Sequence, residues 1–462
     1  MSSIQYAGEF LLKELKIHTS SGTVLDITKQ VASVDLYEDV FSTAISGEIA
    51  FLDVDNLTEN GPIVGQEFMT LKITTPSLDE EEINFTNTSF VIHKLGTKIG
   101  ANANTQLIVL KFTTPELIRN KRVRVSKSYT DSIDKIVESI MRDKRYINTN
   151  KDLYIEPTAG VRKVISPNYH PYDFITNLAT DALNKKYASS YFLFFENTKG
   201  IHFKSLDYIY EQETIGEYVV SDPGKLEDGK KRPSVQDDFQ RVIDFQILSS
   251  LDMLANIQSG VLGSKIIEYN IYSKSFRTPE YKYFSDFEVS KQVESNPFYN
   301  DNVIDEDGHT IGDFPDARIH LHPVNDTGQY DASHTNPTSQ YAYAPNGGGI
   351  GGGGLLFRQA KFAELNNGLN VSMRINGNTT IKCGETINLS VPITGRVHSK
   401  EFDQYYSGKY LITKLRHSFD IATKRHEILC VAAKDAISEG LEQRSQAIEP
   451  IGKIGTIDNL TY

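Results

Sequence analysis

The chain has 462 residues, of which 39% are hydrophobic and 23% charged, and its formal net charge is −12. This length is typical of about three domains, and the composition is that of a globular protein. The negative charge argues against a reader of duplex DNA, because such proteins cluster Lys and Arg against phosphate. No stretch reaches the roughly 20 apolar residues of a membrane-spanning helix, and the start lacks signal-peptide features, so we expect synthesis in the cytoplasm.

Residues 1–115 are predicted to form a first β-barrel ring domain. Apolar residues alternate with polar ones along Val34 and Leu36, and again along Ile45, Ile49 and Phe51, as in half-buried strands. Clusters of Asp, Asn, Gly and Pro at 53–56 and 60–62 supply turns, and the acidic run 79–82 is expected at a hairpin tip.

Residues 116–221 are predicted to form a separate α+β module. A helix is expected where Ile133, Ile136, Val137, Ile140 and Met141 share one face. A second helix is expected to begin at Pro171, because Pro suits the first helical turn. The aromatic run 191–195 then predicts a strand that turns back through 197–200. The basic run 119–127 is interpreted as a solvent-facing strand or loop edge.

The rest of the chain is predicted to be a second barrel with an interruption. Residues 222–278 are interpreted as a connector and the first part of that barrel, with a barrel strand at 266–272. Residues 279–366 are expected to be a loop-rich insertion, 367–438 the rest of the barrel, and 439–462 an extended C-terminal arm. Spaced apolar residues in the arm indicate either docking on a neighbour or fraying; they are Ile451, Ile454, Ile457 and Leu460.

Two stretches of similar sequence recur near the two ends of the chain. Each has a Gly and a Glu before a strand, then a run ending in Lys-Leu, then a final Ile: Gly65, Glu67, 91–95 and Ile118 in the first copy, and Gly384, Glu385, 411–415 and Ile437 in the second. The opening Gly and the final Ile are 53 positions apart in both copies. We therefore expect a mainly β fold with an α+β module and two similar small β-barrel domains of the tube type.

A few residues could carry chemistry, and each has a simpler interpretation. His309, His320, His322 and His334, with Asp313 and Asp316 nearby, are the only cluster resembling metal ligands, but nothing fixes a third ligand, so surface histidines are favoured. The glycine run 347–354 lacks the Lys-Ser or Lys-Thr pair of a phosphate loop, and no helix pattern with a good capping residue follows it. Cys383 and Cys430 lie in predicted strands, which indicates buried thiols. We therefore predict no catalytic, cofactor-binding or metal-binding residue.

Three segments together resemble the baseplate hub proteins of contractile-tailed phages. More distantly, they resemble the hub part of VgrG spike proteins and phage tail protein D. The segments are 34–41 with 47–49 and 62–67, then 170–175 leading to 191–195, and finally 407–417 closing at 434–435. They touch both predicted barrels and the middle module, but neither the insertion 279–366 nor the C-terminal arm.

The resemblance implies a structural homotrimer without enzymatic activity or cofactor, located in the virion baseplate. Each subunit would place two barrels in a pseudo-sixfold ring between the tail tube and the central spike. The implied partners are the spike protein, a tube or tube-initiator protein and other baseplate proteins. The genome would pass through the channel without specific binding, because an acidic lumen repels phosphate.

Two alternatives remain open at this point. The chain could be the hub of a phage-derived contractile injection system that delivers protein instead of DNA. It could also be a tail-associated cell-wall hydrolase, or a metal-dependent hydrolase that uses the 309–334 histidine cluster.

Overall fold

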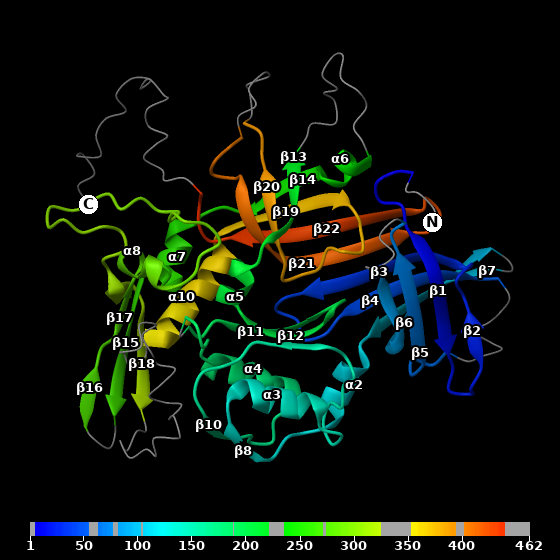
Figure 1. Cartoon of the computed structure of the whole chain (residues 1–462), viewed down its shortest axis with the longest axis horizontal. Coiled ribbons are helices and arrows are strands. Elements are labelled where there is room, and N and C mark those ends of the chain that lie inside the picture. The colour runs from blue at the N-terminus through cyan, green and yellow to red at the C-terminus, as the bar shows by residue number, and fades with distance from the viewer. Residues whose placement is uncertain are drawn as a thin grey trace.

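A long β-sheet forms the centre of the molecule, with a helical module below it and a small second sheet at one side (Figure 1). The computed structural model describes residues 5–54, 63–76, 82–102, 105–187, 189–220, 235–270, 274–324, 353–393 and 402–438. The fold is mainly β, as predicted. The central sheet contains thirteen strands, which come from two units far apart in the sequence.

The first unit is a seven-stranded sheet curved around its own core. Its strands are β1 (Leu11–His18), β2 (Val24–Asp26), β3 (Val31–Asp39), β4 (Ser46–Asp53), β5 (Phe68–Thr74), β6 (Ile83–Asn102) and β7 (Thr105–Thr113). They pair in the order β2-β1-β5-β6-β7-β4-β3. Val34, Leu36, Ile49 and Phe51 are fully buried in this core, which confirms the predicted alternation. No strand pair among the described residues joins β1 to β3.

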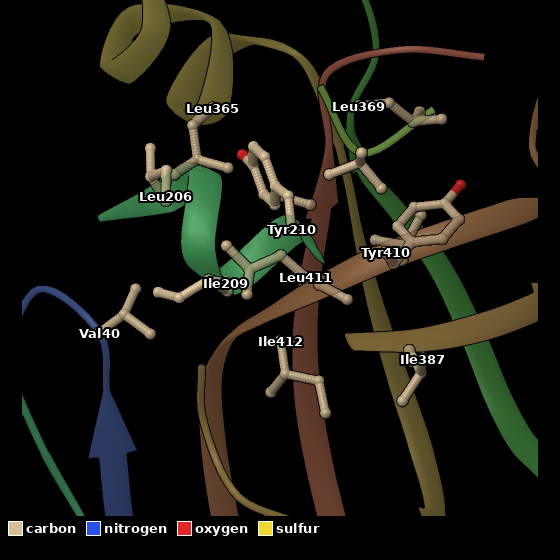
Figure 2. Packing of buried hydrophobic residues seen from close by; sticks show 14 of the residues in the cluster. Val40, Leu206, Ile209, Tyr210, Leu365, Leu369, Ile387, Tyr410, Leu411 and Ile412 are labelled. Carbon is tan, nitrogen blue, oxygen red and sulfur yellow. The ribbon is translucent and has the colours of Figure 1, made fainter. Parts of the chain in front are cut away.

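The second unit is a closed barrel of six strands. Its strands are β13 (Thr214–Val220), β14 (Arg241–Ser249), β19 (Leu369–Asn376), β20 (Thr386–Ser390), β21 (Gly408–Asp420) and β22 (Arg425–Lys434). Pairing runs β21-β20-β13-β14-β19-β22 and returns to β21. Figure 2 shows part of the core of this barrel, where Leu206, Ile209 and Tyr210 pack among residues of β20 and β21.

The middle module packs helices against a short sheet. Its elements are α2 (Pro115–Arg122), β8 (Ser128–Asp131), α3 (Ile133–Arg142), β9 (Leu153–Ile155), β10 (Arg162–Ile165), α4 (Pro171–Asp181), β11 (Phe192–Asn197), β12 (Gly200–Ser205) and α5 (Leu206–Glu211). Both predicted helices are confirmed: the apolar face of α3 is buried, and α4 begins at Pro171. The interpretation of 119–127 as a strand or loop edge is wrong up to Arg122, because helix α2 continues to that residue.

A four-stranded sheet lies beside the second barrel. It consists of β15 (Gly263–Asn270), β16 (Ser275–Arg277), β17 (Glu280–Lys282) and β18 (Ile319–Val324). The prediction that 266–272 contributes a barrel strand is therefore wrong, because β15 pairs only within this sheet among the described residues. Conversely, β13 falls within the predicted α+β module but belongs to the second barrel.

Helices accompany this second sheet. They are α7 (Met253–Ser259), α8 (Tyr283–Asp286) and α10 (Gly353–Asn367), together with the 3₁₀ turns η1 (Phe287–Val289) and η2 (Pro315–Ala317). The short helix α6 (Val235–Phe239) lies instead beside β19 of the second barrel. A helix pattern with a good capping residue was not expected after the glycine run, but helix α10 does begin there, at Gly353. Leu356 and Ala360, four positions apart, bury one face of α10.

Several predictions fall on segments outside the described residues. They concern the turn residues 55–62, the acidic positions 79–81, most of the connector 222–240, His334, the glycines 347–352 and the arm 439–462. Within the described ranges, the helices are all too short or too polar to cross a bilayer.

Candidate assembly interface

Apart from β2, which has no counterpart, each strand of the first unit matches one strand of the second, which confirms the repeat seen in the sequence. The order β1-β5-β6-β7-β4-β3 in the first unit corresponds to β13-β20-β21-β22-β19-β14 in the second. One direction differs, since β1 runs antiparallel to β5 whereas β13 runs parallel to β20. The units are therefore copies of one design whose first strand has diverged.

The match extends to the register of individual pairs. In β6 the pairing with β7 passes from Ile92 directly to Lys94, leaving one residue bulged. In β21 the pairing with β22 passes in the same way from Ile412 to Lys414. A bulge redirects a strand, and both of these strands bulge at the same place.

The repeated Gly and Glu form equivalent turns. Gly65 and Gly384 have φ angles of 94° and 81°, a region that glycine adopts without strain. The backbone oxygens of Glu67 and Glu385 each accept a hydrogen bond from the repeated strand, from Ile92 and Ile412 respectively, at 2.9 Å in both cases. Burial raises the pKa of Glu385 to about 7.

A joint between β3 and β21 connects the two units into one sheet. Seven antiparallel pairs run from Asp39 opposite Lys414 to Ser33 opposite Asp420. Across this joint the guanidinium of Arg416 donates to both carboxylate oxygens of Asp35, each at 3.1 Å. Two copies of one unit thus associate edge to edge within a single chain.

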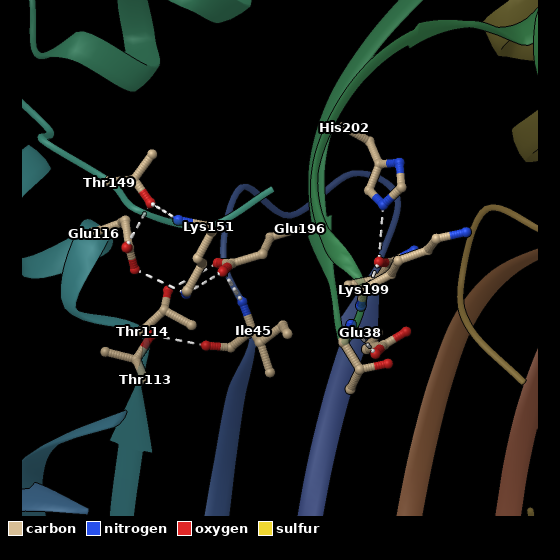
Figure 3. A network of polar contacts seen from close by, with 12 residues as sticks. Glu38, Ile45, Thr113, Thr114, Glu116, Thr149, Lys151, Glu196, Lys199 and His202 are labelled. Carbon is tan, nitrogen blue, oxygen red and sulfur yellow. Dashed lines mark hydrogen bonds and ion pairs between the residues drawn. The ribbon is translucent and has the colours of Figure 1, made fainter. Parts of the chain in front are cut away.

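Glu38 holds three parts of the molecule together near this joint. Its Oε1 accepts from the backbone N–H of Thr198 in the middle module at 2.7 Å, and its Oε2 accepts from that of Cys383 in the second unit at 2.9 Å. Burial raises the pKa of this carboxyl group. Figure 3 shows Glu38 beside a second polar network.

That second network centres on Lys151, which is buried between two carboxylates (Figure 3). Its Nζ lies 2.8 Å from Glu116 and 2.5 Å from Glu196, and Thr114 Oγ1 also donates to Glu196 at 2.8 Å. Desolvation alone would lower the pKa of Lys151, but Glu196 and Glu116 outweigh it and raise that pKa. The network ties the first unit to the middle module.

The second unit carries a counterpart of this buried pair. Asp435 follows Gly384 by the same 51 positions that separate Glu116 from Gly65. Lys361 of α10 lies 2.6 Å from the Asp435 carboxylate, and both side chains are buried. Each unit therefore ends in a buried acid that binds a lysine from the neighbouring helical part.

No family model matches this chain. The chain is 21% identical over 401 residues to the probable baseplate hub protein gp334 of Vibrio phage KVP40, covering 85% of this chain and 87% of that protein. The resemblance to phage baseplate hub proteins is confirmed.

Solved structures of two tail proteins share the fold of this chain. The tail protein from Neisseria meningitidis MC58 has a TM-score of 0.51 and 9% identity, covering 92% of this chain and 97% of that chain. The 43 kDa tail protein of prophage MuSo2 from Shewanella oneidensis has a TM-score of 0.50 and 8% identity, covering 92% and 100%. At these identities the likeness shows the fold alone.

The His and Asp residues considered as possible metal ligands contact different partners in the described part of the chain. His309 Nδ1 lies 2.8 Å from Asp305, and His320 Nε2 accepts from Arg318 at 3.1 Å. Asp313 accepts from Thr310, and Asp316 forms an ion pair with Lys265; the described residues contain no group of three or more potential metal ligands.

Cys430 lies in strand β22, as predicted, whereas Cys383 lies in the turn before β20, so the prediction of a strand at Cys383 is wrong. Cys383 and Cys430 are buried and free. Burial raises the pKa of the Cys430 thiol to about 12 and that of Cys383 well above its usual value. Both thiols are therefore protonated and unreactive at neutral pH.

Sequence reasoning missed Glu38 and Lys151. A signal for Glu38 exists, because it falls in phase with Val34, Leu36 and Val40, all buried on the inward face of the strand pattern. A charged residue in such a position must find partners when the strand is buried. No comparable local signal marks Lys151, whose partners lie 35 and 45 positions away.

Proposed function

We propose that this chain is a structural hub subunit of a phage contractile-tail baseplate. Three copies would form a ring of pseudo-sixfold symmetry that joins the tail tube to the central spike and lets DNA pass. The observation that carries this proposal is the internal duplication, in which two matching units lie side by side in one continuous sheet. The likeness to a probable baseplate hub protein supports it.

Duplication is the property that such an adaptor needs. Three chains with two units each present six similar surfaces toward a sixfold partner, while the differences between the two units keep a threefold pattern for a trimeric partner. The altered direction of β13 relative to β1 is one such difference. The proposed partners are accordingly a tube protein, a spike protein and other baseplate proteins.

The proposed role is mechanical and not enzymatic. Three buried charged residues described above connect parts of the fold: Glu38 joins three parts, and Lys151 and Lys361 each bind the buried acid at the end of one unit. Breaking a buried ion pair costs about 3–5 kcal/mol, so these contacts resist separation of the modules. The net charge of −12 is compatible with a conduit to which DNA does not adhere.

Light scattering during size exclusion tests the proposal on the full chain. The mass of one chain is 51.9 kDa, so a trimer is expected at about 156 kDa. Electron microscopy of that species should show a ring of six similar units around a channel. A monomer at every concentration, or a compact particle without a channel, would contradict the proposal.

A further inference from the structure

Two strand edges of the chain are left without a partner among the described residues. β5 accompanies β6 only as far as Val91, and every residue of β6 from His93 to Gly100 is exposed. On β14, the side opposite β19 has no described partner strand from Asp244 to Ser249. Unpaired edges expose backbone N–H and C=O groups that another strand can bind.

These two edges are the counterparts of the two edges that form the internal joint. β6 corresponds to β21 and β14 corresponds to β3 in the matching strand orders. In β21 the part before the bulge pairs with β20 inside the barrel, and the part after it pairs with β3 of the other unit. β6 has the same bulge, and the part after it is the free part, which also contains a register shift between Leu95 and Lys98 that β21 lacks.

The free edges of β6 and β14 carry exposed apolar residues. At the equivalent positions of the joined edges, β21 and β3, the apolar residues are buried. Leu95 is 42% exposed, whereas Leu415 at the equivalent place in β21 is 2% exposed. Ile247 is 38% exposed, whereas Leu36 at the equivalent place in β3 is fully buried. Both edges therefore have the apolar character of an interface.

We propose that the free edge of β14 pairs antiparallel with the free edge of β6 on a second copy of this chain, in a head-to-tail joint that repeats the internal joint of β3 and β21. This inference rests on the proposed hub function, and it identifies the surfaces that would close the ring. A joint between two different edges is heterologous, so repeating it generates a ring if the rotation closes.

The internal joint also predicts the register of the proposed one. Ile99 of β6 lies opposite Leu107 of β7, and Ser418 of β21 lies opposite Glu427 of β22. Leu107 and Glu427 occupy matching positions in the two units. Ile99 therefore takes the place of Ser418.

The same comparison places the partner residue on β14. Gln246 of β14 lies opposite Ser372 of β19, and Asp35 of β3 lies opposite Glu48 of β4. Ser372 and Glu48 occupy matching positions in the two units, so Gln246 corresponds to Asp35. Because Asp35 faces Ser418 in the internal joint, Gln246 of one copy is expected to face Ile99 of the next.

Cysteine cross-linking tests this register on the full chain. The variant Ile99→Cys/Gln246→Cys should form covalent dimers and trimers under mild oxidation, seen on a non-reducing gel. The native thiols are buried and should not contribute. The register control Ile99→Cys/Asp244→Cys, displaced by two residues, should cross-link several-fold less.

Single variants test the head-to-tail direction. Neither Ile99→Cys nor Gln246→Cys should cross-link alone, because each edge meets the other kind of edge. A mixture of the two single variants should give covalent dimers. Dimers formed by either variant alone would overturn the heterologous joint.

A charge placed at the joint provides an independent readout. Ile247→Lys and Leu95→Lys should each weaken assembly by about tenfold or more in a dilution series, since the lysine would be buried in the joint. The matched control is Leu321→Lys on β18, where the side chain is 74% exposed and lies outside the proposed joint. Circular dichroism would check that each variant is folded.

The outcomes separate this inference from the proposed function. A trimer that neither cross-links at 99 and 246 nor responds to the lysine variants would overturn the joint and leave the ring standing. Cross-linked chains of undefined length would support the joint and overturn the ring. A monomer in all conditions, with no cross-link in the mixture, would overturn both.

Discussion

The backbone N–H of Cys383 donates to Oε2 of Glu38 across 2.9 Å, although the two residues are 345 positions apart. The other oxygen of the same carboxylate binds Thr198, so one side chain of the first unit reaches both the second unit and the middle module. Such a contact makes the relative placement of three parts depend on a single residue.

Replacing Glu38 should therefore loosen the whole molecule. Glu38→Ala removes the acceptor of the buried N–H of Cys383 and of the partly buried N–H of Thr198, and we expect it to lower the free energy of unfolding by about 2–4 kcal/mol. Denaturant unfolding of the full chain measures the loss. The control Glu48→Ala removes a half-exposed carboxylate paired with Lys111, and it should cost about 1 kcal/mol or less. Equal losses in the two variants would contradict the role of Glu38.

Removing the Lys151 ammonium should be more damaging than removing one at the surface. Lys151→Met leaves Glu116 and Glu196 buried without their cation, and we expect a loss of about 3–5 kcal/mol. Lys111→Met, at a half-exposed ion pair, should cost about 1 kcal/mol or less. Thermal or denaturant unfolding compares the two variants, and similar values would show that the buried network contributes no more than a surface pair.

The repeated turn glycine should tolerate no side chain in the second unit. A Cβ on Gly384 would lie 2.6 Å from the ring of Phe195, and its φ of 81° is already strained for alanine. Gly22 has a similar φ of 83°, but a Cβ there would have no neighbour within 4 Å. Gly384→Ala should therefore destabilise the fold more than Gly22→Ala, which isolates the steric part of the cost. Equal midpoints of unfolding would refute this explanation.

Acid should weaken the β21–β22 hairpin through two buried histidines. His417 Nδ1 lies 3.0 Å from His426 Nε2, and burial lowers the pKa of His417 to about 3 and that of His426 well below its usual value. The folded state thus keeps both rings neutral, while the unfolded chain takes up protons below about pH 6.5. Their contribution to stability is complete above that pH and is lost as the pH falls toward 3.

Comparison with a His417→Leu variant isolates this effect. The difference in unfolding free energy between wild type and variant should shrink by roughly 2 kcal/mol between pH 7 and pH 5. Buried carboxyl groups such as Glu385, whose pKa is raised to about 7, shift stability in the opposite direction but are common to both proteins. A difference that stays constant with pH would show that His417 does not titrate on unfolding.

Local patterns in the sequence predicted the features that depend on residues close together in the chain. The apolar face at 133–141 and the Pro at 171 predicted two helices, and the recurring Gly and Glu predicted the duplication. The alternation of apolar and polar residues at 266–272 predicted a strand, but such alternation indicates only that one face of the strand is buried. It does not say which sheet the strand joins, so β15 was assigned to the wrong one.

The interface depended on information that no local pattern holds. The pairing of β3 with β21 joins positions 375 or more apart, and the choice between many possible edges is made by the fit of whole units. Lys151 could not be matched with Glu116 and Glu196 in advance, since acids and lysines are frequent throughout the chain. Glu38 alone carried a readable signal, through its phase with buried apolar residues.

Joining two copies in one chain changes what an unassembled subunit exposes. A single unit of this kind would present two adhesive edges, so two separate units would present four. Because the β3–β21 joint forms during folding, the linked pair presents two. That joint is also insensitive to dilution, since its halves are tethered at a high effective concentration. Fusion of the copies thus halves the surface at risk of aggregation before the partners arrive.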